Sequence, residues 1–288
     1  MLTQVIREST IAPPESGLSE SLKRTVHNRQ AEIAWNLTTA AFYKAGGRPW
    51  KIDGIRDGVC YIGLAFKQDL TQNEPTSACC AAQMFLDSGD GLVFRGAVGP
   101  WYAPDKKEFH IDSAAARELV DLAVKEYTRR MGGPPRELFI HGSAAFSTDE
   151  WRGFTEAVDE GKTRLVGIKI QTERDLRLFR LGAMPVLRGL AFVLHEKAGY
   201  VWTRGYTPRL QTYVGREVPR PLRIDILRGE ADMRTVLADI MALTKVNYNA
   251  CILGDGMPVT LRFANAVGEI LTAAIWRSEE RRVGKECR

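Results

Sequence analysis

The stretch that most constrains the fold of this chain is the run GVCYIGLAFK at positions 58–67. Small or aromatic side chains at Tyr61, Gly63 and Ala65 alternate with the bulky side chains of the intervening residues. This two-residue period is typical of a β-strand, in which successive side chains point to opposite faces of the sheet. The run therefore predicts a central strand around which the other elements are arranged.

The elements closest to this strand are predicted to be one helix and two more strands. A helical pattern covers residues 21–45 and ends at the two glycines that follow, whereas residues 1–20 resemble a surface segment or linker. Residues 77–87 and 91–98 are strand-like and are joined by a glycine-containing turn. The first three strands are therefore expected to form an antiparallel meander.

Helices and strands alternate in the next part of the chain. A helix is predicted over 113–131, a short interior strand over 136–141 and another strand over 164–170. Between the two strands, Ser147 to Glu150 form a capping box that opens a helix, with Gly161 as its expected end. The apolar face of the first helix is predicted to comprise Leu119, Val120, Leu122, Ala123 and Tyr127. The order β-β-β-α-β-α-β predicts a mixed α/β sheet rather than a doubly wound one.

The last third of the chain is expected to add three short strands and two helices. The strands are predicted at 189–195, 200–204 and 222–227, one helix at 231–244, and a final helix with Pro258 at its first position.

Composition places the chain among ordinary soluble globular proteins. It has 288 residues, of which 44% are hydrophobic and 26% charged. No run of about 18 uncharged apolar residues is present, and the first residues lack a signal-peptide core, so cytoplasmic residence without a membrane span is expected. The five cysteines form no CxxC pair, which argues against a zinc site or a disulfide framework. They are expected to be small buried side chains.

The charge is concentrated in the middle of the chain. Residues 162–228 carry 14 basic and 5 acidic side chains. Residues 1–161 carry 18 basic and 22 acidic side chains, and residues 229–288 carry 8 of each. A basic segment beside nearly neutral ones is typical of a surface that meets a polyanion. The alternative is a solvated, arginine-rich face.

Several short motifs, taken in order, are similar to those of a known family. They are Ala34 to Leu37, Tyr43 to Trp50, Tyr61 to Ala65, Phe139 to Ala144, Leu243 to Asn247, Met257 to Val259 and Phe263 to Asn265. With these motifs the chain resembles the PIWI half of short prokaryotic Argonautes, which work with a separate effector protein. The resemblance implies a ribonuclease-H-like α/β fold with a mixed central sheet and helices on both faces. It also implies the end of a MID-like region at 1–45 and a PIWI domain at 46–276. The charged tail at 277–288 departs from the family pattern and is expected to be non-native, from a truncated reading frame.

The resemblance places the acidic metal ligands of an active PIWI nuclease at Ala65, Ser143 and Asn265. A methyl group, a hydroxyl and a carboxamide bring no negative charge to Mg²⁺, which requires hard oxygen ligands in a strict octahedral shell. No position for the fourth ligand, a mobile glutamate, stands out between Gly96 and Glu108. The chain is therefore expected to have no metal site of its own and to be no enzyme.

The alternative is an active nuclease in which nearby acids replace the lost ligands. Asp69 lies about 13 Å beyond Ala65 if the strand continues, too far to share an ion with it. Asp149 and Glu150 are explained by the capping box. His141 could be a catalytic base, but its place at the end of an interior strand favours a hydrogen-bonded core histidine.

Guide binding is the function that the resemblance leaves. Lys44 occupies the place of the family lysine that helps to hold the 5′-phosphate of the guide, although a solvated cation at a helix end is the alternative. No cofactor is expected to be required. The one cofactor that remains an alternative is a Mg²⁺ ion at the guide 5′-phosphate of the full-length protein. The residues expected to contact the nucleic-acid backbone are Arg174, Arg177, Arg180, Arg188, Arg204, Arg209, Arg216 and Arg220, interleaved with Tyr206 and Tyr213.

The expected function is guide-RNA-dependent binding of target nucleic acid, most simply DNA, in prokaryotic antiviral defence. The resemblance implies a partner protein in which an APAZ region is fused to a TIR or Sir2 domain that degrades NAD⁺. Besides the active nuclease, a protein-interaction scaffold that never touches nucleic acid stays as an alternative.

Overall fold

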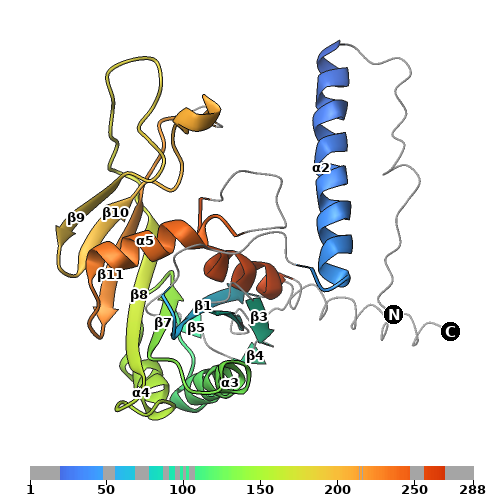
Figure 1. The fold of residues 1–288 in the computed structure, drawn as a ribbon. Coiled ribbons are helices and arrows are strands. Elements are labelled where there is room, and N and C mark those ends of the chain that lie inside the picture. Colours follow the sequence, from blue (N-terminus) through green and yellow to red (C-terminus); the bar gives the residue numbers. More distant parts are fainter. Residues whose placement is uncertain are drawn as a thin grey trace, which may run out of the picture.

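The computed structural model describes residues 20–47, 56–68, 78–86, 91–94, 98–99, 102–103, 108–213, 215, 217–246 and 256–269. Its main body is a nine-stranded mixed sheet with helices packed on both faces (Figure 1). This architecture confirms the predicted α/β class.

The strands of the main sheet come from most of the chain. They are β1 (Val59–Gln68), β2 (Ala78–Leu86), β3 (Gly91–Phe94), β4 (Val98–Gly99), β7 (Glu137–Gly142), β8 (Arg164–Thr172), β9 (Ala191–His195), β10 (Ala198–Val201) and β11 (Leu222–Arg228). Their order across the sheet is β3-β2-β1-β7-β8-β11-β10-β9, with β4 also paired to β2. A separate pair, β5 (Tyr102–Ala103) and β6 (Glu108–Phe109), was not predicted.

Strand directions confirm the two halves expected from the sequence. β1 is antiparallel to β2, and β2 to β3, which gives the meander. β1 is parallel to β7, and β7 to β8, which gives the parallel half. β11, β10 and β9 then continue the sheet in antiparallel steps. β1 therefore lies inside the sheet, as its apolar pattern on both faces predicted.

Two cores form because the side chains of β1 alternate between the faces. Tyr61 belongs to the core beneath α5 (Met233–Leu243) and the last helix, whose residues 259–269 are helical. Ile62 and Leu64 belong to the core beneath α3 (Ser113–Met131) and α4 (Thr148–Glu156). Figure 1 shows these helix pairs on opposite sides of the sheet.

Helix boundaries agree closely with the sequence pattern, and two details were wrong. The predicted capping box of α4 is present, with Ser147 and Glu150 bonded reciprocally. Leu122, predicted to be inward on α3, is exposed, because the buried stripe runs through Val120, Ala123 and Tyr127. Gly161 does not end α4, whose last residue is Glu156.

The N-terminal helix α2 (Glu20–Lys44) occupies the range predicted for it and stands clear of the sheet in Figure 1. None of its side chains that the structure describes is buried. No helix of the described residues is long and apolar enough to cross a membrane.

A cluster of ion pairs around two nearly buried acids lies at the end of the sheet away from Ser143. Arg56 pairs with Glu137, the first residue of β7, and lies 3.1 Å from Asp239 of α5. Arg164 of β8 also pairs with Glu137. Desolvation raises the pKa of Asp239, and Arg56 opposes that rise, so the arginine holds two nearly buried acids beside one another.

Candidate nucleic-acid interface

The fold brings the three predicted metal-ligand positions to one end of the central strands. The parallel register of β1 and β7 pairs Leu64 with Gly142. Ser143 follows directly after β7, and one further step in the same register places it beside Ala65. Neighbouring strands lie about 4.8 Å apart, so these two backbone positions are adjacent.

The last helix completes this arrangement because it lies along β1. Gly63 faces its first turn, and a Cβ there would stand 2.1 Å from the carbonyl oxygen of Thr260. Near the other end of the helix, a Cβ added to Gly268 would stand 3.2 Å from the Cβ of Lys67. The helix that carries the third position therefore runs along β1 on the Gly63 face, to which Ala65 also points.

The side chains at these positions do not fit the two-metal site of a ribonuclease-H-like nuclease. Ala65 is 5% exposed and offers only a methyl group. The amide of Asn265 donates to the carbonyl of Leu261 in its own helix at 2.9 Å. Ser143 has a hydroxyl, whereas Mg²⁺ requires carboxylate and water oxygens in an octahedral shell. Among the described residues, no group of three or more histidines, cysteines or acids could hold a metal ion. Lack of cleavage stays a prediction.

The acids considered as replacements have other roles or lie outside the described residues. Glu150 is 1% exposed and accepts hydrogen bonds from the backbone amides of Ser147 and Ile111 at 2.7 and 2.9 Å. Asp149 is exposed and pairs with Arg152 at 3.0 Å. Asp69 lies outside the described residues. Glu150 thus tightens the start of α4 rather than facing the three converging positions.

His141 is a buried core histidine, as its place in an interior strand suggested. Its Nδ1 lies 3.0 Å from the hydroxyl of Thr260, and its ring lies near that of Tyr61. Burial lowers the pKa of His141 to about 3. The imidazole therefore stays neutral near pH 7 and links β7 to the last helix.

This pKa makes His141 a source of acid sensitivity. The unfolded chain binds a proton below about pH 6.5, whereas the folded His141 does so only near pH 3. Stability is therefore expected to fall as the pH drops below 6.5, by about 2 kcal/mol at pH 5. Urea unfolding at pH 7 and pH 5 should show a drop that is about 2 kcal/mol smaller in His141→Gln. In His195→Gln, which alters an exposed histidine of β9, the drop should match that of the unmodified protein; equal drops in all three proteins would contradict the assignment.

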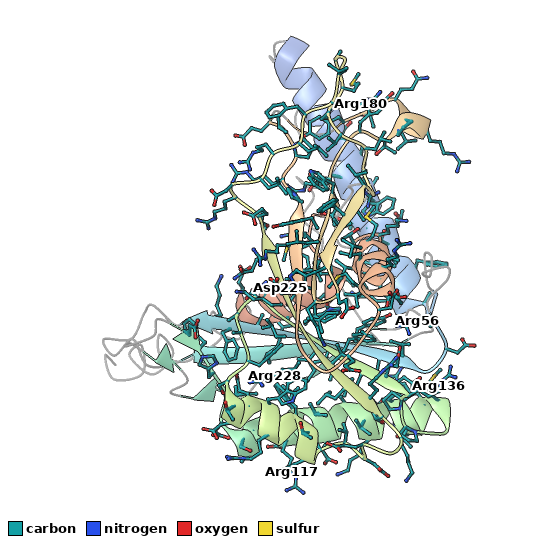
Figure 2. All side chains as sticks on the ribbon, turned by 90° about the vertical axis from the view of Figure 1, so that its left-hand side faces the viewer. Arg56, Arg117, Arg136, Arg180, Asp225 and Arg228 are labelled. Atoms are coloured by element: carbon teal, nitrogen blue, oxygen red, sulfur yellow. The ribbon has the colours of Figure 1, made fainter. Side chains whose placement is uncertain are left out.

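A groove opens beside Ser143 on the sheet face opposite α5. It encloses about 790 Å³. Polar side chains of β8 and β11 line it, and their register pairs Arg223 with Gln171 and Asp225 with Lys169. The intervening isoleucines of both strands point the other way, into the core beneath α5. Figure 2 shows Asp225 near the middle of the molecule, between Arg180 at one end and Arg117 of α3 at the other.

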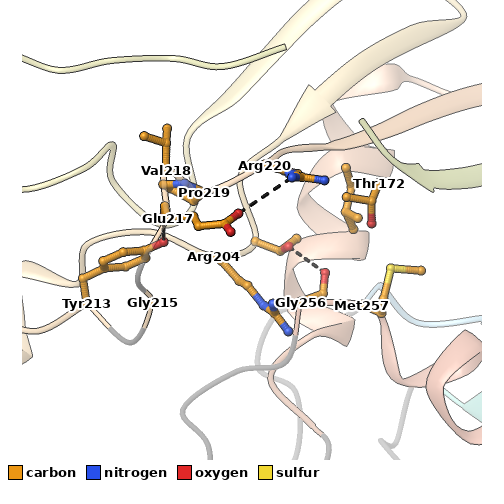
Figure 3. A pocket seen from close by; sticks show the side chains of 12 residues that line it. Thr172, Arg204, Tyr213, Gly215, Glu217, Val218, Pro219, Arg220, Gly256 and Met257 are labelled. Atoms are coloured by element: carbon orange, nitrogen blue, oxygen red, sulfur yellow. Dashed lines mark hydrogen bonds and ion pairs between the residues drawn. The ribbon is translucent and has the colours of Figure 1, made fainter. Parts of the chain in front are cut away.

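A second cavity extends this groove. It encloses about 560 Å³ and shares Thr172 and Met257 with the first. Arg204, Tyr213 and Arg220 line it, as Figure 3 shows. The two adjoining cavities lie next to each other at Thr172 and Met257, and we refer to them together as the groove.

The charge of the groove is mixed rather than strongly basic. Its basic side chains are Lys169, Arg174, Arg204, Arg220 and Arg223, and its acidic ones are Glu173, Asp175, Glu217 and Asp225. Two acids neutralise arginines, since Asp225 pairs with Arg223 at 3.1 Å and Glu217 with Arg220 at 3.7 Å. A polyanion in the groove would therefore meet few unneutralised cations, and the affinity from phosphate contacts alone would be moderate.

The eight arginines predicted to contact nucleic acid do not form one surface. Three of them, Arg174, Arg204 and Arg220, line the groove. Arg177 and Arg180 lie on the connection between β8 and β9, residues 173–190, which we call the arm, and Arg209 lies in the short helix η1 (Pro208–Leu210). Arg216 lies outside the described residues.

Arg188 serves the fold rather than an open surface. Its Nε donates to the carbonyl oxygen of Thr203 at 2.9 Å, and one Nη lies 3.4 Å from the hydroxyl of Thr244. Partial burial lowers the pKa of its guanidinium. This arginine therefore ties the end of the arm to α5.

Lys44 is exposed in the last turn of α2, which both a contact with the guide 5′-phosphate and a solvated cation at a helix end require.

Cys60 is buried as predicted, whereas the burial of the other four cysteines lies outside what the structure describes.

Sequence reasoning missed Lys169 and Arg223. Both lie at outward positions of strands whose alternate residues are isoleucines. That alternation was visible in the sequence, but it does not show that no helix covers this part of the sheet. In the structure, α4 packs against β8 near Gly167, and the side chains of Lys169 and Arg223 beyond it line the groove.

The solved structures with a similar fold include several Argonautes. The structure of Clostridium butyricum Argonaute bound to a guide DNA and a 19-mer target DNA has a TM-score of 0.65 and 17% identity, over 90% of this chain and 32% of that one. The structure of A. aeolicus Argonaute has a TM-score of 0.56 and 17% identity, over 85% of this chain and 33% of that one. The structure of Marinitoga piezophila Argonaute in complex with 5′ OH guide RNA has a TM-score of 0.53 and 11% identity, over 75% of this chain and 30% of that one.

No protein-family model and no curated protein matches the chain. The chain spans about a third of the length of these Argonautes. At such low identity the likeness concerns the fold, and the fold of this chain is the ribonuclease-H-like fold of an Argonaute PIWI domain.

Proposed function

We propose that the chain is a PIWI module that holds a guide and its target nucleic acid without cutting them. The observation that carries this proposal is the convergence of Ala65, Ser143 and the helix of Asn265 at one end of the sheet, beside a groove with Lys169 and Arg174. A methyl group, a hydroxyl and a carboxamide at these three positions supply no carboxylate to hold the paired metal ions of phosphodiester hydrolysis. Phosphate contacts in the groove would position a duplex without reading its sequence.

The similar structures support nucleic acid as the ligand. The C. butyricum protein is bound to guide and target DNA, and an M. piezophila structure contains a guide RNA with a target DNA. We propose a guide RNA and a DNA target for this chain, with Lys44 contributing to the 5′-phosphate site. The rest of that site, and a Mg²⁺ ion in it, would come from a MID region.

A partner protein would supply the effector activity. We propose an APAZ-containing protein with a TIR or Sir2 domain, in a prokaryotic defence system in which target binding activates NAD⁺ degradation. The supporting observation is again the chemistry of the three positions, because a sensor that cannot cleave needs another protein to produce a response.

Cleavage and binding assays on one sample test the proposal. Purified protein, guide RNA and labelled complementary DNA should give no guide-directed product with Mg²⁺ or Mn²⁺, while filter binding detects a complex. Because the groove offers only a few unneutralised cations, log K should fall with log salt with a slope of roughly −2 to −3. Cleavage that EDTA abolishes would favour the active nuclease, and affinity that is absent or insensitive to salt would favour a protein scaffold.

A further inference from the structure

Large apolar side chains are exposed along one part of the chain. On the arm, Phe179 is 76% exposed and Leu181 is 98% exposed. The other exposed large apolar residues of the arm, β9 and η1 are Leu176, Leu178, Met184, Leu187, Leu190, Phe192, Val193, Leu194 and Leu210. Isolated apolar side chains on a surface are ordinary, but such a concentration marks a surface that something covers.

β9 adds a sheet edge to this surface. It ends the strand order and, within the described residues, pairs with β10 alone. All five of its residues are exposed, and Phe192 and Leu194 are about half exposed. An apolar edge strand with unpaired backbone groups is a ready template for another strand.

A groove runs beside this edge on the α5 side of the sheet. Val193 is paired with Gly199 of β10. A Cβ added to Gly199 would stand 3.1 Å from a side-chain carbon of Leu237 in α5, so this face of the pair points toward α5. Val193 therefore points to the α5 side as well. The groove encloses about 780 Å³, with Val193, Leu237 and Met241 among its lining residues. Arg234, an exposed residue of α5, also lines it.

We propose that the arm and the β9 edge together dock a separate polypeptide, an extended segment that pairs with β9 and presents apolar and acidic side chains in alternation. Side chains of a strand beside β9 would point alternately to the α5 side of the sheet, where this groove lies, and to the opposite side. Acidic side chains are specified by charge, since Arg177 and Arg180 lie on the arm and Arg234 lines the α5 groove, which Asp239 and Lys245 also line.

The exposed apolar area is large enough for a specific interface. At roughly 150–200 Å² for each side chain, the exposed fractions of these residues amount to on the order of 1,000 Å². A standard interface buries about 800 Å² on each partner. The apolar surface alone therefore matches one side of a stable complex.

Two other occupants fit less well. A second copy would bring two positively charged arms together, which opposes self-association. Nucleic acid would place phosphates over leucine and phenylalanine, whereas protein–nucleic acid interfaces are predominantly polar and basic. Arg177 and Arg180 of the arm, predicted from sequence to contact nucleic acid, are thereby assigned to a protein partner.

Synthetic peptides test the proposal on the full chain. The probe is a fluorescein-labelled 12-residue peptide of alternating leucine and glutamate, with leucine–lysine and serine–glutamate peptides for comparison. Fluorescence anisotropy should show that the leucine–glutamate peptide binds at least tenfold more tightly than either comparison peptide. Hydrogen exchange should then show slower exchange of the β9 amides in its presence.

Variants on the exposed residues locate the site and should fold. Phe179→Ser/Leu181→Ser, and separately Leu194→Glu, should each weaken binding of the leucine–glutamate probe at least fivefold, while Leu122→Ser on α3 should leave its binding unchanged. Probe binding that is equal for the three peptides, absent, or unaffected by the variants would overturn the proposal. So would a dimer in sedimentation that the arm variant dissociates, or an arm variant that weakens guide–target binding but not peptide binding.

Discussion

Reversing two charges in the groove, Lys169→Glu with Arg174→Glu, is expected to weaken binding of a guide–target duplex about 100-fold. Lys169 projects from β8 opposite Asp225, and Arg174 follows the same strand on the exposed rim. Each reversal replaces a phosphate contact by repulsion, and about 1.4 kcal/mol for each gives two powers of ten. Filter binding at several salt concentrations should also show that log K falls less steeply with log salt in the double variant, with a slope smaller in magnitude by about 2 than in the unmodified protein.

A matched variant separates this local effect from net charge. Arg117→Glu with Lys125→Glu changes the total charge equally, but on α3, which covers β1 and β7 on the same face of the sheet. Arg117 lies far from Asp225 of the groove in Figure 2. Both side chains are more than half exposed, and their ion pairs with neighbouring acids are worth little. Equal losses in the two double variants would show that binding responds to overall charge and not to the groove.

The fold could be predicted because its signals are local. The alternation in β1, the capping box of α4 and the glycine after α3 each determine their own element, and the structure has each of them where the sequence indicated. Leu122 shows where this reasoning fails. Apolar periodicity places it near the inward stripe of α3, but burial depends on the angle at which the helix meets the sheet, which local sequence does not encode.

The candidate site could be predicted only in part, because its residues act through tertiary placement. Ala65 and Ser143 were found through motif order, and the strand register brings them together. The basic middle of the chain suggested one surface, but a linear charge count cannot separate Arg174 in the groove from Arg180 on the arm or Arg188 beneath it. Their separation follows from the long excursions that leave β8 and β10.

Replacing Gly63 by alanine is expected to lower the free energy of unfolding by about 3 kcal/mol, among the largest effects of any single methyl group in this chain. The added Cβ would stand 2.1 Å from the carbonyl oxygen of Thr260 and would collide with backbone that no rotamer change can move. Gly133→Ala is the control, because a Cβ there meets nothing within 4 Å and no left-handed backbone is involved. Thermal unfolding should show a midpoint about 10 °C lower in the first variant and unchanged in the second. A stable Gly63→Ala protein would mean that the last helix does not press on β1. Asn265 would then not lie beside Ala65 and Ser143, which the register of β1 and β7 brings together.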